Sequence, residues 1–171
     1  ETCKAQVYNA FEDLISNADF KHIIISYSND GLLSTNEILD LLKAHCITNS
    51  VKIYKIDYNR YKSKIQTQHE PQFEYLFYAR KKDVSFNYVS PYTVSTSTIT
   101  TAKKKFIKSP MNYIGGKYKL LPQLTQLFPK TIDTFVDLFA GSFTVTANIK
   151  ANKYICNDIY YKIVEMIRTL C

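Results

Sequence analysis

"FVDLFAGSFTVTANIKANKYICND", residues 135–158, contains a glycine between an apolar run and a stretch of helical character. The apolar run, residues 134–140, predicts a strand that is buried on both faces. Gly141, one of only four glycines in the chain, allows a sharp turn, and residues 142–150 are predicted to form a helix. A second short strand is predicted at residues 153–158. Strand, glycine turn, helix and strand together predict a βαβ unit of a parallel sheet.

Polar residues stand where these two predicted strands end, which is the edge at which open parallel sheets bind ligands. Asp137 lies in an otherwise apolar strand, so its carboxylate needs donors, either backbone N–H groups or the ammonium of a ligand. Asp158 ends the next strand, where a carboxylate can accept hydrogen bonds from a ribose diol. The alternative is that Gly141 only makes a tight turn and that Asp158 only caps the following helix.

The second glycine motif, "GGK" at residues 115–117, does not complete a phosphate-binding loop. That loop requires glycine where Met111 stands and serine or threonine where Tyr118 stands. The dinucleotide fingerprint G-x-G-x-x-G is also absent, because Gly141 has no glycine neighbours. A nucleoside triphosphate and a dinucleotide are therefore disfavoured as ligands.

The first half of the chain alternates helical and strand patterns. Helices are predicted at residues 4–18 and 34–45, the second of which starts with a capping box formed by Ser34 and Glu37. Strands are predicted at 22–28, 51–58 and 73–80, with a basic, polar loop between the last two. The β-branched run at 22–28 predicts a central parallel strand, like 134–140, whereas 51–58 and 73–80 are expected to pair antiparallel at an edge of the same mixed sheet.

The two halves are separated by a Ser/Thr-rich stretch, residues 84–105, which is predicted to be a linker. After it, residues 111–129 predict a glycine loop that leads into a helix with an apolar stripe. A last helix is predicted through residues 163–167.

The two glycine motifs and their spacing resemble the Dam-like DNA adenine methyltransferases. The matching residues are "NYIGGKYKLLPQL" and a following "FP", then "FVDLFAGS" with "TV" after it, then "ND", all between residues 106 and 170. The resemblance implies an enzyme that uses S-adenosyl-L-methionine to methylate the exocyclic amine of adenine in a specific sequence of double-stranded DNA.

The resemblance also implies a cofactor-binding site. Lys117 would serve the cofactor carboxylate, Asp158 the ribose hydroxyls, and Ile159 would flank the adenine. The full set of implied cofactor-binding residues is Tyr113, Lys117, Asp137, Phe139, Ala140, Gly141, Asp158 and Ile159. Ser142 departs from the pattern, since the family usually has a second glycine there, and this predicts weaker cofactor binding.

Residues 1–83 resemble the carboxyl-terminal part of the tandem, type IIS subgroup of the same family. There this part supplies the fifth strand, a helix and the antiparallel strand pair that closes the sheet. The implied fold is α/β, an incomplete Rossmann-like methyltransferase sheet that is mixed and has an antiparallel edge hairpin. Residues 106–171 would then be the cofactor-binding start of a methyltransferase domain.

The order of these two portions is inverted relative to an ordinary family member. The chain is either the junction of two tandem methyltransferase domains or a permuted and truncated form, and the linker favours the junction. The catalytic Asp-Pro-Pro-Tyr loop of the family is absent, so no catalytic residue is assigned and the chain alone is expected to be inactive. The alternative function is a non-catalytic module that binds S-adenosylmethionine or DNA, as a partner of the remainder of the methyltransferase.

The resemblance implies a protein that acts on DNA in the bacterial cytoplasm, and composition alone does not decide this. The net charge of +7, with basic runs at 80–82 and 103–105, suits a polyanion, although a solvated lysine-rich surface explains it equally well. The apolar runs are far shorter than a membrane span, and "ETCKAQ" does not resemble a signal peptide. The four scattered cysteines predict reduced thiols and no metal site.

Overall fold

The computed structural model describes residues 2–57, 73–82, 105–109, 111 and 115–168. The chain divides into two compact units, Glu1–Pro91 and Tyr92–Cys171. The basic loop expected between the second and third strands lies outside the described residues, as does nearly all of the expected linker. Among the described residues, no helix combines the length and the apolar character that a membrane span requires.

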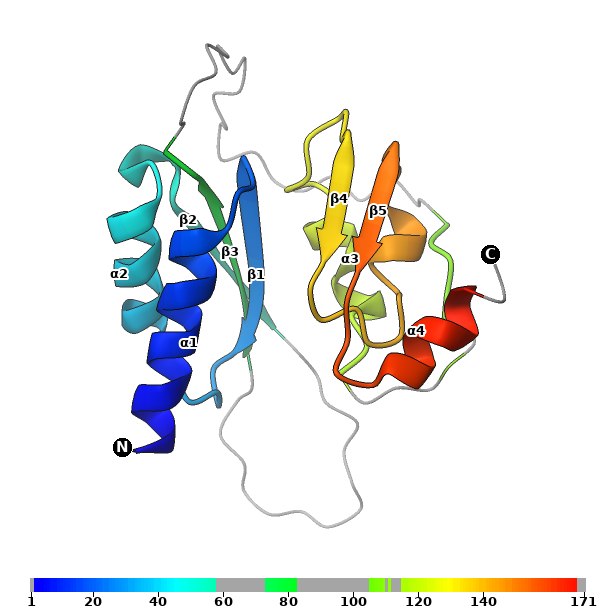
Figure 1. Ribbon diagram of the computed structural model, residues 1–171. Helices are drawn as coiled ribbons and strands as arrows, with labels where there is room; N and C mark the ends of the chain where they lie inside the picture. Colours follow the sequence, from blue (N-terminus) through cyan, green and yellow to red (C-terminus); the bar gives the residue numbers. More distant parts are fainter. Residues whose placement is uncertain (1, 58–72, 83–104, 110, 112–114, 169–171) are drawn as a thin grey trace. The chain divides into compact units, whose positions relative to one another are not determined.

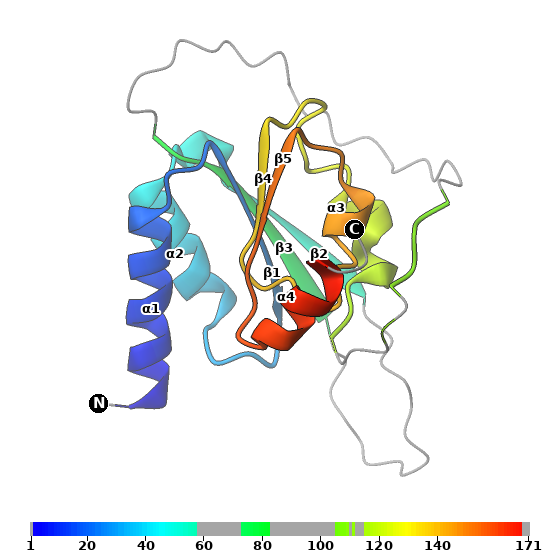
Figure 2. The same ribbon diagram turned by 45° about the vertical axis from the view of Figure 1, so that its right-hand side comes forward.

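The first unit has an antiparallel sheet with two helices on one face (Figures 1 and 2). Its elements, in order, are α1 (Cys3–Asn17), β1 (His22–Ser28), α2 (Thr35–His45), the 3-10 turn η1 (Thr48–Ser50), β2 (Lys52–Asp57) and β3 (Phe73–Arg80). These bounds agree closely with the predicted helices and strands.

β3 is the central strand of this sheet, and the strand order is β1-β3-β2. The antiparallel pairing of β2 with β3 confirms the prediction for these two strands. The prediction that residues 22–28 form a central parallel strand is wrong, because β1 pairs antiparallel with β3. No residue of β1 is fully buried, and only its alternate residues pack on the core, so the expected burial on both faces is not found in this unit. Side-chain type also carries no information on the direction of the neighbouring strand.

The core of the first unit lies between the helices and the sheet. Alternate residues of β1, namely Ile23, Ile25 and Tyr27, pack on it, as expected from the two-residue period of a strand. The buried members of this core are Ile15, Leu33, Ile38, Leu41, Leu42, Cys46, Phe77 and Ala79.

A capping box fixes the start of α2, as the sequence predicts. Ser34 Oγ accepts the Glu37 backbone N–H at 3.3 Å, and Glu37 Oε2 accepts the Ser34 backbone N–H at 2.7 Å. Lys4 of α1 adds an ion pair to Glu37 Oε1 at 2.9 Å. The hydrogen bonds from Lys4 and then from Ser34 lower the pKa of Glu37 to about 2. Because this pKa is depressed, the stabilisation is present above the ordinary value of 4.5 and is lost as the pH falls through about 2.

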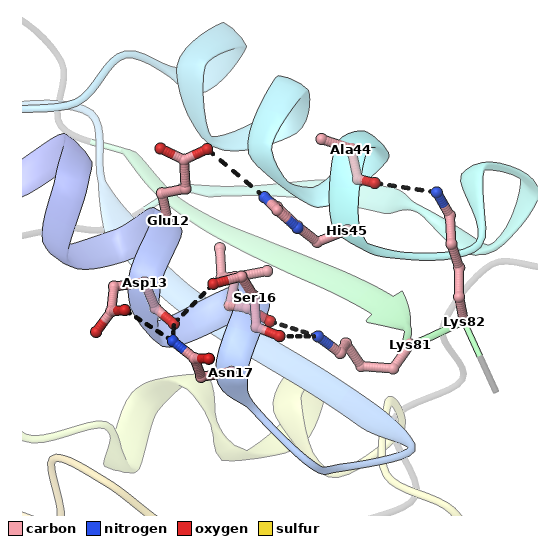
Figure 3. Close-up of polar contacts among 9 residues, drawn as sticks. Glu12, Asp13, Ser16, Asn17, Ala44, His45, Lys81 and Lys82 are labelled. Atoms are coloured by element: carbon pink, nitrogen blue, oxygen red, sulfur yellow. Dashed lines mark hydrogen bonds and ion pairs between the residues drawn. The ribbon is translucent and has the colours of Figure 1, made fainter. Parts of the chain in front are cut away.

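Two lysines that follow β3 bind the carboxyl ends of the two helices (Figure 3). Lys81 Nζ donates to the carbonyl oxygens of Ile15 at 2.7 Å and Ser16 at 2.8 Å, near the end of α1. Lys82 Nζ donates to the carbonyl oxygen of Ala44 at 3.0 Å, near the end of α2. A cation at this position satisfies free carbonyl groups and interacts favourably with the helix dipole. Two charges of the basic run at 80–82 therefore stabilise the fold of this unit.

We expect Lys81→Met to lower the free energy of unfolding of the first unit by about 1–2 kcal/mol, because it removes two charge-assisted hydrogen bonds and keeps the aliphatic stem. Urea unfolding followed by circular dichroism at the helix band measures this loss. Lys82→Met is the matched control, because its single bond is exposed and should contribute less than about 0.5 kcal/mol. Equal losses in the two variants would contradict the stabilising role of the two Lys81 hydrogen bonds.

The second unit is built around a parallel pair of strands. Its elements are η2 (Tyr118–Leu120), α3 (Leu121–Leu124), β4 (Thr134–Asp137), η3 (Thr146–Asn148), β5 (Lys153–Cys156) and α4 (Tyr161–Arg168). β4 and β5 pair in parallel, with Thr134 opposite Lys153 and Asp137 opposite Cys156, which confirms the predicted parallel pair. The last helix is also confirmed.

The predicted helix at 142–150 is wrong, because only η3 forms there. Hydroxyl and amide side chains bond locally in this segment and compete with helical backbone bonds. Ser142 Oγ and Thr144 Oγ1 are 2.7 Å apart, and Asn148 Nδ2 donates to the Thr144 carbonyl oxygen at 2.8 Å. The helix predicted within 111–129 is likewise shorter, since η2 and α3 together cover only 118–124.

The predicted strand at 134–140 stops at Asp137, but its continuation stays bonded to the segment after β5. The Asn157 N–H donates to the Asp137 carbonyl oxygen at 2.8 Å, and the Ala140 N–H donates to the Asn157 carbonyl oxygen at 2.9 Å. The Asn157 side chain also donates to the Leu138 carbonyl oxygen at 3.1 Å. These bonds fix the loop that carries the predicted site.

Candidate functional site

A cleft of about 630 Å³ opens at the carboxyl ends of β4 and β5. This is a typical volume for a small-molecule site. Its lining residues are Gly115, Gly116, Lys117, Asp137, Phe139, Ala140, Gly141, Ser142, Thr144, Val145, Asn157, Asp158 and Ile159. Every predicted site residue that the structure describes is among them, and Tyr113 lies outside the described residues.

Gly141 forms the turn at the base of the cleft. Its φ of 48° lies in the left-handed region, which glycine enters without the steric cost that other residues pay. The Gly141 N–H donates to Asp158 Oδ2 at 2.8 Å. The Phe143 N–H donates to the Ala140 carbonyl oxygen at 2.7 Å, which completes the turn. Phe143 also has a positive φ of 57°, so the backbone after the turn is held in a conformation that is unfavourable for an aromatic residue.

Asp158 connects the turn after β4 to the start of the last helix. Its Oδ2 accepts from Gly141, and its Oδ1 accepts the Tyr160 N–H at 3.0 Å. The local role that the sequence left open, a bond to the backbone before the following helix, is therefore present. A carboxylate has about four acceptor positions, so Asp158 can keep both bonds and still accept from a ligand hydroxyl.

Asp137 is a largely buried carboxylate at the end of β4. Burial raises its pKa above the ordinary value, and the negative charge of Asp158 raises it further. Hydrogen bonds from the Thr146 hydroxyl and the Phe139 backbone amide act in the opposite direction, although the net shift is upward. A cation that enters the cleft would favour the ionised form of this carboxylate.

Two apolar side chains beside the cleft are unusually exposed. Phe139 is 80% exposed and Ile159 is 90% exposed, and both line the cleft. Large apolar side chains that surround a concave site in this way offer surface to a flat, apolar ligand group. The resemblance predicts that Ile159 flanks the adenine and that Phe139 also contacts the cofactor.

The glycine loop before η2 supplies another wall. Gly115 has a φ of 83°, and among the described residues beyond its chain neighbours no heavy atom lies within 4 Å of the position that a Cβ would take. Gly116 and Lys117 line the cleft beside it. Asn148 ties the preceding segment to η3, because its side chain accepts the Ile107 N–H at 2.7 Å and donates to the Ile107 carbonyl oxygen at 2.8 Å.

The sequence alone assigns no role to Thr146, or to five residues that line the cleft, namely Gly115, Gly116, Thr144, Val145 and Asn157. The sequence does contain an indication of the role of Thr146. A buried Asp137 requires a hydrogen-bond donor, and a hydroxyl in the following turn can supply it. Among the described residues, no group of three or more His, Cys, Asp and Glu side chains is arranged to hold a metal ion.

A known protein family matches the part of the chain that carries the cleft. The family described as D12 class N6 adenine-specific DNA methyltransferase matches residues 113–171. These residues include every predicted cofactor contact. The predicted resemblance to DNA adenine methyltransferases is confirmed.

Relatives of this chain match it nearly from end to end. It is 46% identical to Type II methyltransferase M.FokI of Planomicrobium okeanokoites over 170 residues, which is 98% of this chain and 26% of the relative. It is 44% identical to Modification methylase StsI of Streptococcus sanguinis over 165 residues, which is 96% of this chain and 25% of the relative. Modification methylase LlaI of Lactococcus lactis subsp. lactis is 29% identical over 171 residues, which is 98% of this chain and 24% of the relative. No solved structure matches the chain.

The chain therefore spans about a quarter of the length of these relatives. Because each of these matches covers both units, the segments that match the two units follow one another in the same order in the relatives.

Proposed function

We propose that this chain is part of a DNA adenine methyltransferase of a type II restriction–modification system, and that its second unit binds S-adenosyl-L-methionine. The observation that carries the proposal is the cleft at the ends of β4 and β5, within the residues that match the adenine methyltransferase family. The relatives are named methyltransferases or methylases, which favours an enzyme over a non-catalytic binding module.

The groups that line the cleft fit the parts of this cofactor. Asp137 offers a partly desolvated carboxylate for the amino group, and Lys117 offers a cation for the carboxylate. Asp158 offers acceptor capacity to the ribose hydroxyls. Phe139 and Ile159 provide apolar surface for the adenine and the methionine chain. When bound, S-adenosylmethionine supplies a methyl group on a positively charged sulfur.

The tandem arrangement belongs to the same proposal. Residues 1–83 form the carboxyl-terminal sheet portion of one methyltransferase domain, residues 84–105 a linker, and residues 106–171 the start of the next domain. A match that covers both units, in relatives about four times as long as this chain, favours this junction over a permuted and truncated form. In a complete domain, the β4–β5 pair and a sheet such as β1-β3-β2 would belong to one Rossmann-like sheet. The proposed substrate is double-stranded DNA, and the proposed location is the bacterial cytoplasm, where this DNA lies.

Calorimetric titration of S-adenosylmethionine into the chain tests the site. We expect Asp158→Ala to weaken binding about tenfold or more, because charge-assisted hydrogen bonds to the ribose are lost and the Gly141 amide loses its acceptor. Glu165→Ala is the control, since this exposed acidic residue of α4 does not line the cleft. Unchanged affinity in Asp158→Ala would show that the ribose site is assigned wrongly.

A further inference from the structure

Thr146 supports the cleft from a position outside its lining. It is the first residue of η3, and its Oγ1 donates to Asp137 Oδ2 at 2.7 Å. The same hydroxyl lies 3.7 Å from the sulfur of Cys156, opposite Asp137 in the strand pair. Thr146 thus links η3 to the two residues that end β4 and β5.

Asp137 depends on such a donor because of its surroundings. Its carboxylate lines the cleft at the end of a strand and is largely withdrawn from water, which disfavours its charged form. The titratable groups around it are Asp158 and Cys156, with Lys117 lining the same cleft. Asp158 disfavours a second negative charge, and the thiol of Cys156 is kept neutral by its own burial. Of the contacts that favour ionisation of Asp137, the Thr146 hydrogen bond is the largest.

The Thr146 hydroxyl also fixes the orientation in which the Asp137 carboxylate can accept hydrogen bonds. Oδ2 of Asp137 accepts the hydroxyl of Thr146 in η3. The Phe139 backbone amide, in the loop that follows β4, also donates to this carboxylate. The remaining acceptor positions of the Asp137 carboxylate can accept hydrogen bonds from a ligand in the cleft. The irregular backbone between Gly141 and η3 is what brings Thr146 to this point.

We infer that Thr146 is a positioning residue, which orients the Asp137 carboxylate to receive the positively charged amino group of the ligand. This inference rests on the proposed function, since it assumes that S-adenosylmethionine is the ligand. Thr146 does not touch the ligand, and its effect passes entirely through Asp137.

The test compares two ligands and three variants by calorimetry. Methylthioadenosine keeps the adenine and ribose of the cofactor and lacks the amino acid. Thr146→Val keeps the shape of the side chain and removes the hydroxyl, and it should weaken S-adenosylmethionine binding about fivefold or more. Binding of methylthioadenosine should stay within twofold of the wild type. Thr146→Ala should behave like Thr146→Val, and Thr146→Ser should restore binding because it keeps the donor.

The pH dependence of S-adenosylmethionine binding gives a second test. It should change in Thr146→Val if Thr146 positions Asp137, and it should not change if Thr146 only supports the fold. Loss of the hydroxyl removes a bond that favours the charged carboxylate, so the pKa of Asp137 should rise further. Binding of the cationic ligand requires the ionised form and falls as the pH drops below that pKa. In Thr146→Val, S-adenosylmethionine binding should therefore begin to fail at a higher pH than in the wild type.

The outcomes separate this inference from the proposed function. Equal weakening of both ligands, or unchanged affinity and pH dependence in Thr146→Val, would overturn the positioning role and leave the cofactor site standing. A wild-type chain that binds neither ligand would overturn the proposed function and this inference with it.

Discussion

The purified chain should transfer no detectable methyl group to DNA, even where it binds S-adenosylmethionine. Methyl transfer requires the adenine to leave the base stack and its amine nitrogen to be aligned with the methyl group. The family does this with an Asp-Pro-Pro-Tyr loop, and no Pro-Pro pair occurs in the sequence. Without alignment, a reaction loses most of an effective molarity that is worth about 7–11 kcal/mol.

The polar turn at the end of β1, residues 28–30, cannot replace that loop, because its groups are used within the first unit. Asn29 Oδ1 accepts the Phe73 N–H at 2.8 Å, and the Asn29 N–H donates to the Phe73 carbonyl oxygen at 3.1 Å. Ser28 Oγ donates to the Asp30 carboxylate. The turn therefore joins β1 to the start of β3.

The assay uses cofactor with a tritiated methyl group and duplex DNA of mixed sequence, with a heat-inactivated sample as the background. A full-length relative such as M.FokI serves as the positive control. Label in adenine above the background would show that this chain contains a catalytic loop that its sequence does not reveal.

Gly141→Val should reduce S-adenosylmethionine affinity about a hundredfold. A β-branched residue at a φ of 48° is strongly disfavoured, so the turn must change conformation. That change moves the amide that binds Asp158, and the added side chain fills part of the cleft. Together these effects amount to about 3 kcal/mol of lost binding free energy.

Ala147→Val is the matched control, since Ala147 is exposed, does not line the cleft and has no positive φ. Gly141→Ala should fall between the wild type and Gly141→Val, because it shares the strain but adds less volume. Thermal melting of each variant establishes that the second unit remains folded. Affinity in Gly141→Val within threefold of the wild type would refute the role of this turn.

The sequence predicts those features of the fold that depend on residues close together in the chain. The bounds of β1 and the capping box of α2 depend on neighbouring residues, and both were predicted correctly. The partner of β1 depends on residues 74–80, far along the chain, and the apolar run at 22–28 gives no sign of it. The extent of a strand is a local signal in this sequence, and the direction of its partner is not.

The same limit applies to the candidate site. Gly141 and Asp158 were predicted to stand together because both follow strands of one parallel pair, and the structure places them in contact. Their contacts with a cofactor remain a prediction. The helix predicted after Gly141 does not form, because hydroxyl and amide side chains in this segment make local hydrogen bonds that compete with helical ones. Thr146 turns toward Asp137 instead of extending a helix, and this choice depends on a tertiary contact.

The central position of β3 has a consequence for the way this chain is made on the ribosome. β3 is the last strand of its sheet to be synthesised, yet β1 and β2 each pair with it and not with each other. At roughly 5–20 residues per second, the earlier strands wait several seconds for their partner. During this time Phe77 and Ala79 of β3 are not yet present to pack against the helices. A nascent chain arrested before Phe73 would thus contain both helices and two strands, and still lack the strand that joins them.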